Sequence, residues 1–182
     1  MRFILAACAL ALTAACTFTA QTAETGCSLS ASNQWQAGGT TFTVEGATSG
    51  PDCEHAVATL VLRNADGVAI WAEAHITEDI MVLKPAHDVA AMRTALAEWI
   101  DPAKNTTMLS TSALPEWPEN AEMPESGEFP FYPAEGYDRE TYTALRAANL
   151  PLFCYVQGME SLACLSYGDG GVEKIGVQTF PG

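Results

Sequence analysis

The feature that most constrains the fold is a hairpin pattern between residues 55 and 76. Residues 55–63 and 68–76 read as strands, and Asn64-Ala65-Asp66-Gly67 between them suits a type I turn that ends in a left-handed glycine. Pairing Asn64 with Val68 aligns even-numbered residues with one another and makes one face wholly apolar. That face holds Ala56, Ala58, Leu60, Leu62, Val68, Ile70, Ala72, Ala74 and Ile76. The pattern predicts an antiparallel hairpin with its even face in the core.

Other segments extend this hairpin to an α+β domain over residues 40–182. A strand is predicted from Thr40 to Glu45, an amphipathic helix over residues 86–100, and a second helix from Asp138 to Asn149. Three further strands are predicted at 152–157, 162–167 and 172–180. We expect the N-terminal hairpin and this three-stranded C-terminal meander to join one antiparallel sheet or a small open barrel.

The first sixteen residues predict export. Arg2 precedes an apolar run over residues 3–12, which is too short to cross ~30 Å of hydrocarbon as a helix but suits a cleaved signal peptide of residues 1–15. The sequence Leu12-Thr13-Ala14-Ala15-Cys16 resembles a bacterial lipobox, with Thr13 where an aliphatic residue is usual. The resemblance implies a lipid on Cys16 and a flexible tether over residues 16–39. Cleavage after Ala15 or Ala20 would instead give a soluble periplasmic or secreted protein.

The remaining cysteines predict two disulfides. Removal of the leader and lipidation of Cys16 leave an even set, Cys27, Cys53, Cys154 and Cys164. Oxidising compartments permit disulfides, and four cysteines allow three pairings. We favour Cys27–Cys53 and Cys154–Cys164 because the members of each pair are close in sequence. The spacings are not C-x-x-C, which disfavours a metal site at these thiols.

The charge of the chain limits its partners. It carries 22 acidic and 8 basic residues, and Arg2 lies in the leader while every acidic residue follows it. The resulting net negative charge repels phosphate backbones and anionic lipids, so nucleic-acid binding is not expected. The charge serves solubility first, and it also suits attraction of cations or of a basic envelope protein.

An unusual period occupies residues 115–135, here called the triplet segment. Seven consecutive triplets begin with Pro, Ala or Gly, and the first five have Glu in second place. Polyproline II has three residues per turn, so an extended segment would stack the glutamates on one edge and aromatic side chains on another. The sequence predicts either a proline-stiffened surface loop or a binding strap. The candidate binding residues are Glu116, Trp117, Glu119, Glu122, Met123, Glu125, Glu128 and Phe129.

Few residues point to catalysis. His55, Glu73 and His75 would share one face of the predicted hairpin, and two imidazoles with a carboxylate can hold zinc. In the predicted register the histidines are diagonal neighbours, so solvent-exposed or partner-bound side chains are the simpler interpretation. The chain has no G-x-S-x-G, S-x-x-K or H-E-x-x-H motif, and no cofactor is indicated.

These observations lead to a non-catalytic binding or structural module of the cell envelope, held to a membrane by an N-terminal lipid and facing the periplasm. Two alternatives remain. One is a small periplasmic hydrolase or metal-dependent enzyme that uses His55, Glu73 and His75. The other is an inhibitor of a basic cell-wall hydrolase, by analogy with small disulfide-bearing lipoproteins of that role.

Overall fold

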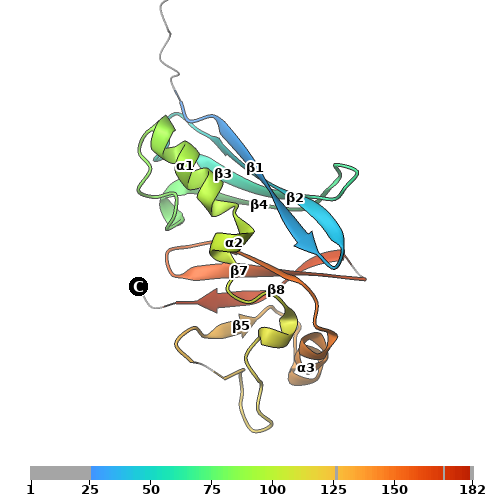
Figure 1. Cartoon of the computed structure of the whole chain (residues 1–182). Coiled ribbons are helices and arrows are strands. Elements are labelled where there is room, and N and C mark those ends of the chain that lie inside the picture. The colour runs from blue at the N-terminus through green and yellow to red at the C-terminus, as the bar shows by residue number, and fades with distance from the viewer. Residues whose placement is uncertain (1–25, 126, 170, 181–182) are drawn as a thin grey trace, which may run out of the picture.

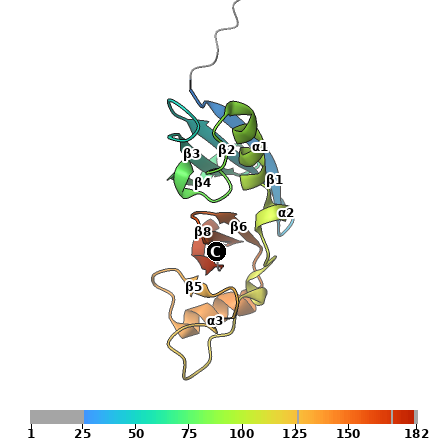
Figure 2. The same ribbon diagram turned by 90° about the vertical axis from the view of Figure 1, so that its left-hand side faces the viewer.

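The computed structural model describes residues 26–125, 127–169 and 171–180. Two four-stranded antiparallel sheets, with strand orders β1-β2-β3-β4 and β5-β8-β7-β6, form the body. Figures 1 and 2 both place the second sheet between the first sheet and helix α3. The α+β class is confirmed, but the expectation of one sheet or a barrel is wrong, because β4 and β6 end their own sheets as edge strands.

The first sheet is a meander of β1 (Leu29–Ala37), β2 (Thr40–Ser49), β3 (Val57–Arg63) and β4 (Ala69–Ile76). β1 pairs with β2 over its whole length, from Leu29 opposite Thr48 to Ala37 opposite Thr40. The predicted tether is therefore too long at its C-terminal end. Trp35 and Ala37 face inward and are buried, which gives β1 an apolar side that its polar composition conceals.

The predicted hairpin forms, but its register changes at a β-bulge. Arg63 lies opposite Ala69 as expected, whereas Leu62 lies opposite Trp71, so that Ile70 is an extra residue. From Trp71 to the end of β4, the odd-numbered residues of β4 lie opposite even-numbered residues of β3 and point to the same, inward face. The prediction that Val68, Ala72, Ala74 and Ile76 face the core is wrong: these four are exposed. Trp71, Glu73 and His75 point inward instead.

The second sheet contains β5 (Phe131–Pro133), β6 (Leu152–Val156), β7 (Ser161–Gly168) and β8 (Gly171–Thr179). The predicted three-stranded meander is confirmed as β6, β7 and β8, and the short β5 adds to the free edge of β8. Cys154 and Cys164 lie opposite each other on β6 and β7 and are bonded, as are Cys27 and Cys53. Both predicted disulfides are thus confirmed, and they are compatible with an exported protein.

Three helices complete the described chain: α1 (Val89–Trp99), α2 (Pro102–Asn105) and α3 (Arg139–Ala148). Asp88 caps α1 by accepting a hydrogen bond from the Ala91 N–H, so the helix begins later than predicted. Asp138 and Thr141 form the capping box of α3, and Tyr142 and Leu145 are buried as expected. Two short 3₁₀ turns, Thr77–Asp79 and Thr111–Ala113, lie in the connections.

Helix α1 covers part of the inward face of the first sheet at Gly46. A Cβ atom at this position would lie 2.6 Å from Ile100 Cγ2 and 3.0 Å from Leu96 Cδ1. The glycine thus allows a close helix-to-sheet approach. At the end of α1 the Trp99 indole N–H donates to the Val156 carbonyl over 2.7 Å, which connects the helix to the second sheet.

Within the described residues, none of the helices combines the length and the apolar character needed to span a bilayer. The predicted signal peptide, Cys16 and the first part of the tether lie outside the described residues.

Candidate functional site

A cluster of polar side chains lies where β4 meets the second sheet. The inter-sheet cluster consists of Trp71, Glu73, His75, Tyr155, Gln157 and Lys174. Glu73 accepts a hydrogen bond from the hydroxyl of the buried Tyr155 and lies 3.4 Å from Lys174 Nζ. Lys174 Nζ also donates to Gln157 Oε1 over 2.8 Å. The carboxylate of Glu73 is therefore engaged on both oxygens, which stabilises the contact between the sheets.

The Tyr155 hydroxyl donates its proton to Glu73. Burial, followed by the hydrogen bond to Glu73, raises the pKa of Tyr155 far above its ordinary value. The phenol therefore stays neutral at physiological pH and holds its proton toward the carboxylate. This arrangement is suited to holding the two sheets together.

His75 lies beside this ion pair in an aromatic setting. Its ring is 5.9 Å from that of Trp99 and 6.1 Å from that of Tyr155, both at steep angles. Burial lowers the pKa of His75, opposed in part by the negative charge of Glu73. The imidazole is therefore neutral at pH 7. Its Nε2 atom and the Trp71 Nε1 atom are both buried without a protein hydrogen-bond partner.

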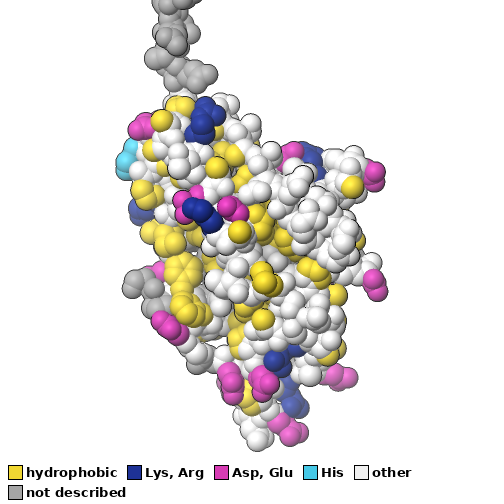
Figure 3. Space-filling model, viewed as in Figure 1, with side chains coloured by type: hydrophobic (Ala, Val, Ile, Leu, Met, Phe, Trp, Pro, Cys, Tyr) yellow, Lys and Arg dark blue, Asp and Glu magenta, His cyan; other side chains and the backbone are white. Residues whose placement is uncertain are grey.

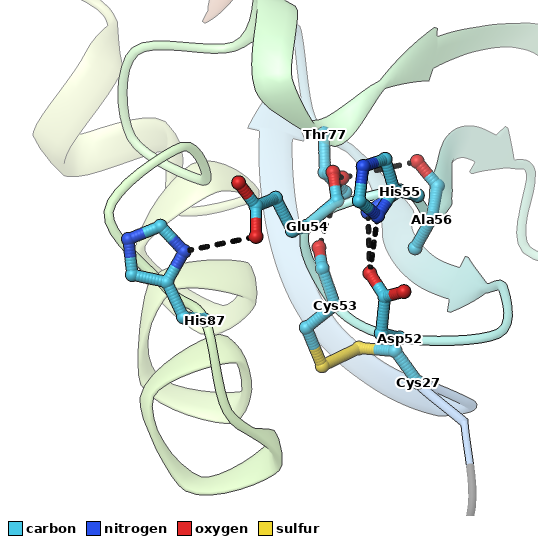
Figure 4. Close-up of polar contacts among 8 residues, drawn as sticks. All are labelled: Cys27, Asp52, Cys53, Glu54, His55, Ala56, Thr77 and His87. Atoms are coloured by element: carbon cyan, nitrogen blue, oxygen red, sulfur yellow. Dashed lines mark hydrogen bonds and ion pairs between the residues drawn. A yellow bond between two sulfur atoms is a disulfide. The ribbon is translucent and has the colours of Figure 1, made fainter.

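The structure does not bring His55 together with Glu73 and His75. His55 lies in the turn before β3, where its Nδ1 is 2.8 Å from Asp52 Oδ1, and the side chain is 62% exposed. Figure 4 shows this pair next to the Cys27–Cys53 disulfide, with His87 approaching Glu54 at 3.9 Å from the other side. Among the residues that the structure describes, no three His, Cys, Asp or Glu side chains form a group able to hold a metal ion. The β-bulge separates the three predicted zinc ligands, because it turns Glu73 and His75 inward while His55 stays in the exposed turn.

The triplet segment folds into a closed loop and does not run extended. The Glu125 N–H donates to the Glu116 carbonyl over 2.7 Å, and the Ala121 N–H donates to the Pro118 carbonyl over 3.1 Å. Polyproline II has no internal hydrogen bonds, so the predicted extended strap is wrong for this part of the segment. The segment ends in β5, where Phe131 enters the second sheet.

Aromatic contacts fix the loop to helix α3. The Trp117 ring packs edge-on against Tyr142 with 5.6 Å between centroids, and its indole N–H donates to the Ala121 carbonyl over 3.0 Å. The Tyr142 hydroxyl donates to the Pro115 carbonyl over 3.0 Å. Pro124 is buried. Trp117 thus serves as an anchor for the loop more than as an exposed binding residue.

The other candidate residues of the segment face solvent. Glu116, Glu119, Glu122, Glu125 and Glu128 are all exposed, and Met123 and Phe129 are 42% and 48% exposed. Glu116 approaches Arg146 of α3 at 3.8 Å, while its side chain stays 73% exposed. Figure 3 shows acidic side chains over this end of the molecule, interspersed with Lys and Arg side chains. The loop from Glu116 to Glu125 therefore presents four carboxylates and Met123 on a hydrogen-bonded backbone, and Glu128 and Phe129 are exposed beyond it.

Sequence reasoning missed the partners of Glu73. Tyr155 and Lys174 lie 82 and 101 residues away from it in the chain. Nothing in the spacing of these residues signals a contact, since it depends on the bulge in β4 and on the stacking of two separate sheets.

No protein-family model matches the chain, and no match was found among curated proteins or among solved structures.

Proposed function

We propose that this chain is a cell-envelope lipoprotein that acts as a non-catalytic binding module. In this proposal Cys16 carries the lipid, and the triplet segment recognises a basic protein of the envelope. The observation that carries the proposal is the display of five exposed carboxylates along the triplet segment, four of them within the loop that the Glu125 N–H to Glu116 carbonyl hydrogen bond closes. A preorganised loop loses little conformational entropy when it binds, which favours a defined contact over diffuse attraction.

The position of the loop supports the same role. The described chain starts just before β1 at one end of the molecule, and the triplet segment lies at the opposite end, near α3 (Figure 1). A lipid attached on the N-terminal side would place the first sheet toward the membrane. The carboxylates would then point away from the anionic lipid surface, toward soluble or cell-wall-bound partners.

The enzyme alternative draws no support from the contacts of its candidate residues. Glu73 is bound by Tyr155 and Lys174, and His55 pairs with Asp52. The inhibitor alternative is a special case of the proposal in which the basic partner is a cell-wall hydrolase.

The test compares two variants of equal charge. In the first, Glu116, Glu119, Glu122, Glu125 and Glu128 are all changed to Gln. In the control, five exposed acidic residues elsewhere are neutralised: Glu78, Asp79, Glu98, Glu140 and Glu160. Affinity capture from envelope extract with the purified mature protein should recover a basic protein, which the loop variant loses and the control variant keeps. Equal recovery with all three proteins would show that the loop is not the contact.

The anchor has its own test. Labelled palmitate should enter the full chain and should not enter Cys16→Ser, which should leave the membrane fraction. An unlabelled full chain, or a Cys16→Ser variant that stays with membranes, would refute lipidation at this residue.

A further inference from the structure

Three hairpin turns from both sheets meet beside Tyr167. They are the β1–β2 turn at Gly38, the β3–β4 turn at residues 64–67, and the β7–β8 connection at Gly168, Asp169 and Gly171. Two hollows open between them, of about 450 Å³ and about 340 Å³, and Tyr167 and Gly171 line both. The two hollows, which share these lining residues, are called here the Tyr167 groove.

The walls of the groove combine apolar side chains with two carboxylates. Leu150 and Pro151 line the larger hollow together with Asp169. Ile70 and Val172 line the smaller one together with Asp66. Among the residues that the structure describes, no Lys, Arg or His side chain lines either hollow. Each hollow is therefore lined by apolar side chains and one carboxylate, and Arg63 Nη1 donates to the Gly67 carbonyl in the turn that carries Asp66.

Local contacts hold these walls in place. The Tyr167 ring packs edge-on against buried Phe42, with 4.7 Å between ring centroids. Asn64 Oδ1 accepts hydrogen bonds from the N–H groups of Asp66 and Val68, which fixes the turn that carries Asp66. The bulge places Ile70 at this site, since it is the residue left unpaired between Ala69 and Trp71.

We propose that the Tyr167 groove binds a lysine or arginine side chain of a polypeptide partner. The cationic head would lie over the Tyr167 ring and between Asp66 and Asp169, where cation–π and charge attraction act together. The methylene stem would pack on the apolar side chains of the lining, as the stems of long basic side chains do. The carboxylates of Asp66 and Asp169 in the lining favour a positively charged side chain. The inference rests on the proposed function for the class of partner, and it adds a second contact separate from the triplet segment.

The test uses a small probe and nuclear magnetic resonance of the ¹⁵N-labelled mature protein. Nα-acetyl-lysine methylamide should shift the amide signals of Ile70, Tyr167, Gly168 and Val172 in a saturable way. The uncharged probe Nα-acetyl-norleucine methylamide, which keeps the four-carbon stem and lacks the ammonium group, should not. Tyr167→Ala should bind the lysine probe about 2- to 30-fold more weakly, the range set by loss of a cation–π contact.

Further variants separate binding from folding. Tyr167→Phe keeps the aromatic ring and should retain binding, whereas Asp66→Asn combined with Asp169→Asn should weaken it. The variant with five glutamines in the triplet segment should bind the probe normally, so the two proposals can fail independently. Shifts confined to the triplet segment, equal binding of the norleucine probe, or stronger binding of an uncharged chitotriose at the same amides would each overturn the inference.

Discussion

Glu73 is the residue on which the contact between the two sheets depends most. It brings a carboxylate to the inward face of an edge strand, where Tyr155 and Lys174 of the second sheet both reach it. A charge in such a place is stable only when its partners are present, and those partners in turn need the carboxylate.

Glu73→Ala should therefore lower the free energy of unfolding by about 1–3 kcal/mol, because the buried Tyr155 hydroxyl loses its acceptor. Urea unfolding measures the change. Lys84→Ala, at an exposed position outside the cluster, is the control and should stay within about 0.5 kcal/mol of the wild type. A Glu73→Ala protein as stable as this control would show that the contact does not stabilise the fold.

His75 should make the stability of the protein sensitive to acid. Burial lowers its pKa in the folded state below the ordinary value of 6.5, so the unfolded chain takes up a proton first as the pH falls. Its contribution to stability is complete above about pH 6.5 and declines below it. Urea unfolding between about pH 5 and pH 8 should show a loss at low pH that is smaller in His75→Gln.

His55 provides a control because its pKa is shifted in the opposite direction to that of His75. The hydrogen bond from its ring to Asp52 raises the pKa of His55, so its contribution is present below pH 6.5 and is lost as the pH rises through the folded-state pKa. His55→Gln should leave the acid loss intact. An acid profile that is identical in His75→Gln and the wild type would contradict the assignment of that loss to His75.

At the scale of single elements, the sequence predicts the turns, caps and strands that nearby residues determine. It does not predict features that depend on packing against distant parts of the chain. The Asn64–Gly67 turn, the Asp138 cap and the strands β6 to β8 all follow from signals within a few residues. The bulge at Ile70 does not. It turns Trp71 inward in place of Ala72, so a large aromatic side chain gains burial against a sheet that lies far away in sequence.

Helix α1 offers a test of element packing at Gly46. Gly46→Ala should destabilise the protein by about 1–3 kcal/mol, since the new methyl group would meet the buried Leu96 and Ile100 side chains. Thermal unfolding measures the change. Gly127→Ala is the matched control because no atom lies within 4 Å of its added Cβ. Equal melting temperatures for the two variants would show that α1 does not pack closely on β2.

The triplet segment shows the limit of a periodic pattern. Its period suggests an extended strap, yet Trp117 and Pro124 pack inward and the backbone closes on itself between Glu116 and Glu125. Trp117→Ala should free the loop and speed cleavage by a glutamate-specific protease at Glu119 and Glu122. Phe129→Ala, at a 48% exposed position, should not. Unchanged cleavage in Trp117→Ala would mean that the tryptophan does not anchor the loop.

For the whole molecule, the division into two sheets could not be predicted from the sequence. Both disulfides join segments close in the chain, and their pairing could be predicted on that ground. The separation of the sheets depends on pairings that no local signal specifies, above all the addition of β1 to β2 and of β5 to β8. The same holds for the proposed binding surface of the triplet segment. The period of the sequence locates its glutamates, but not their position at the end of the molecule opposite the start of β1 (Figure 1).

The orientation of the molecule and the role of the loop can be measured together in living cells that export the protein. A photo-crosslinking amino acid is placed at position 122 in the triplet segment or at position 55 beside the N-terminal end of the domain. The proposed function predicts that position 122 captures a basic envelope protein and that position 55 does not. Capture of the same protein from position 55 alone, with nothing from position 122, would contradict it.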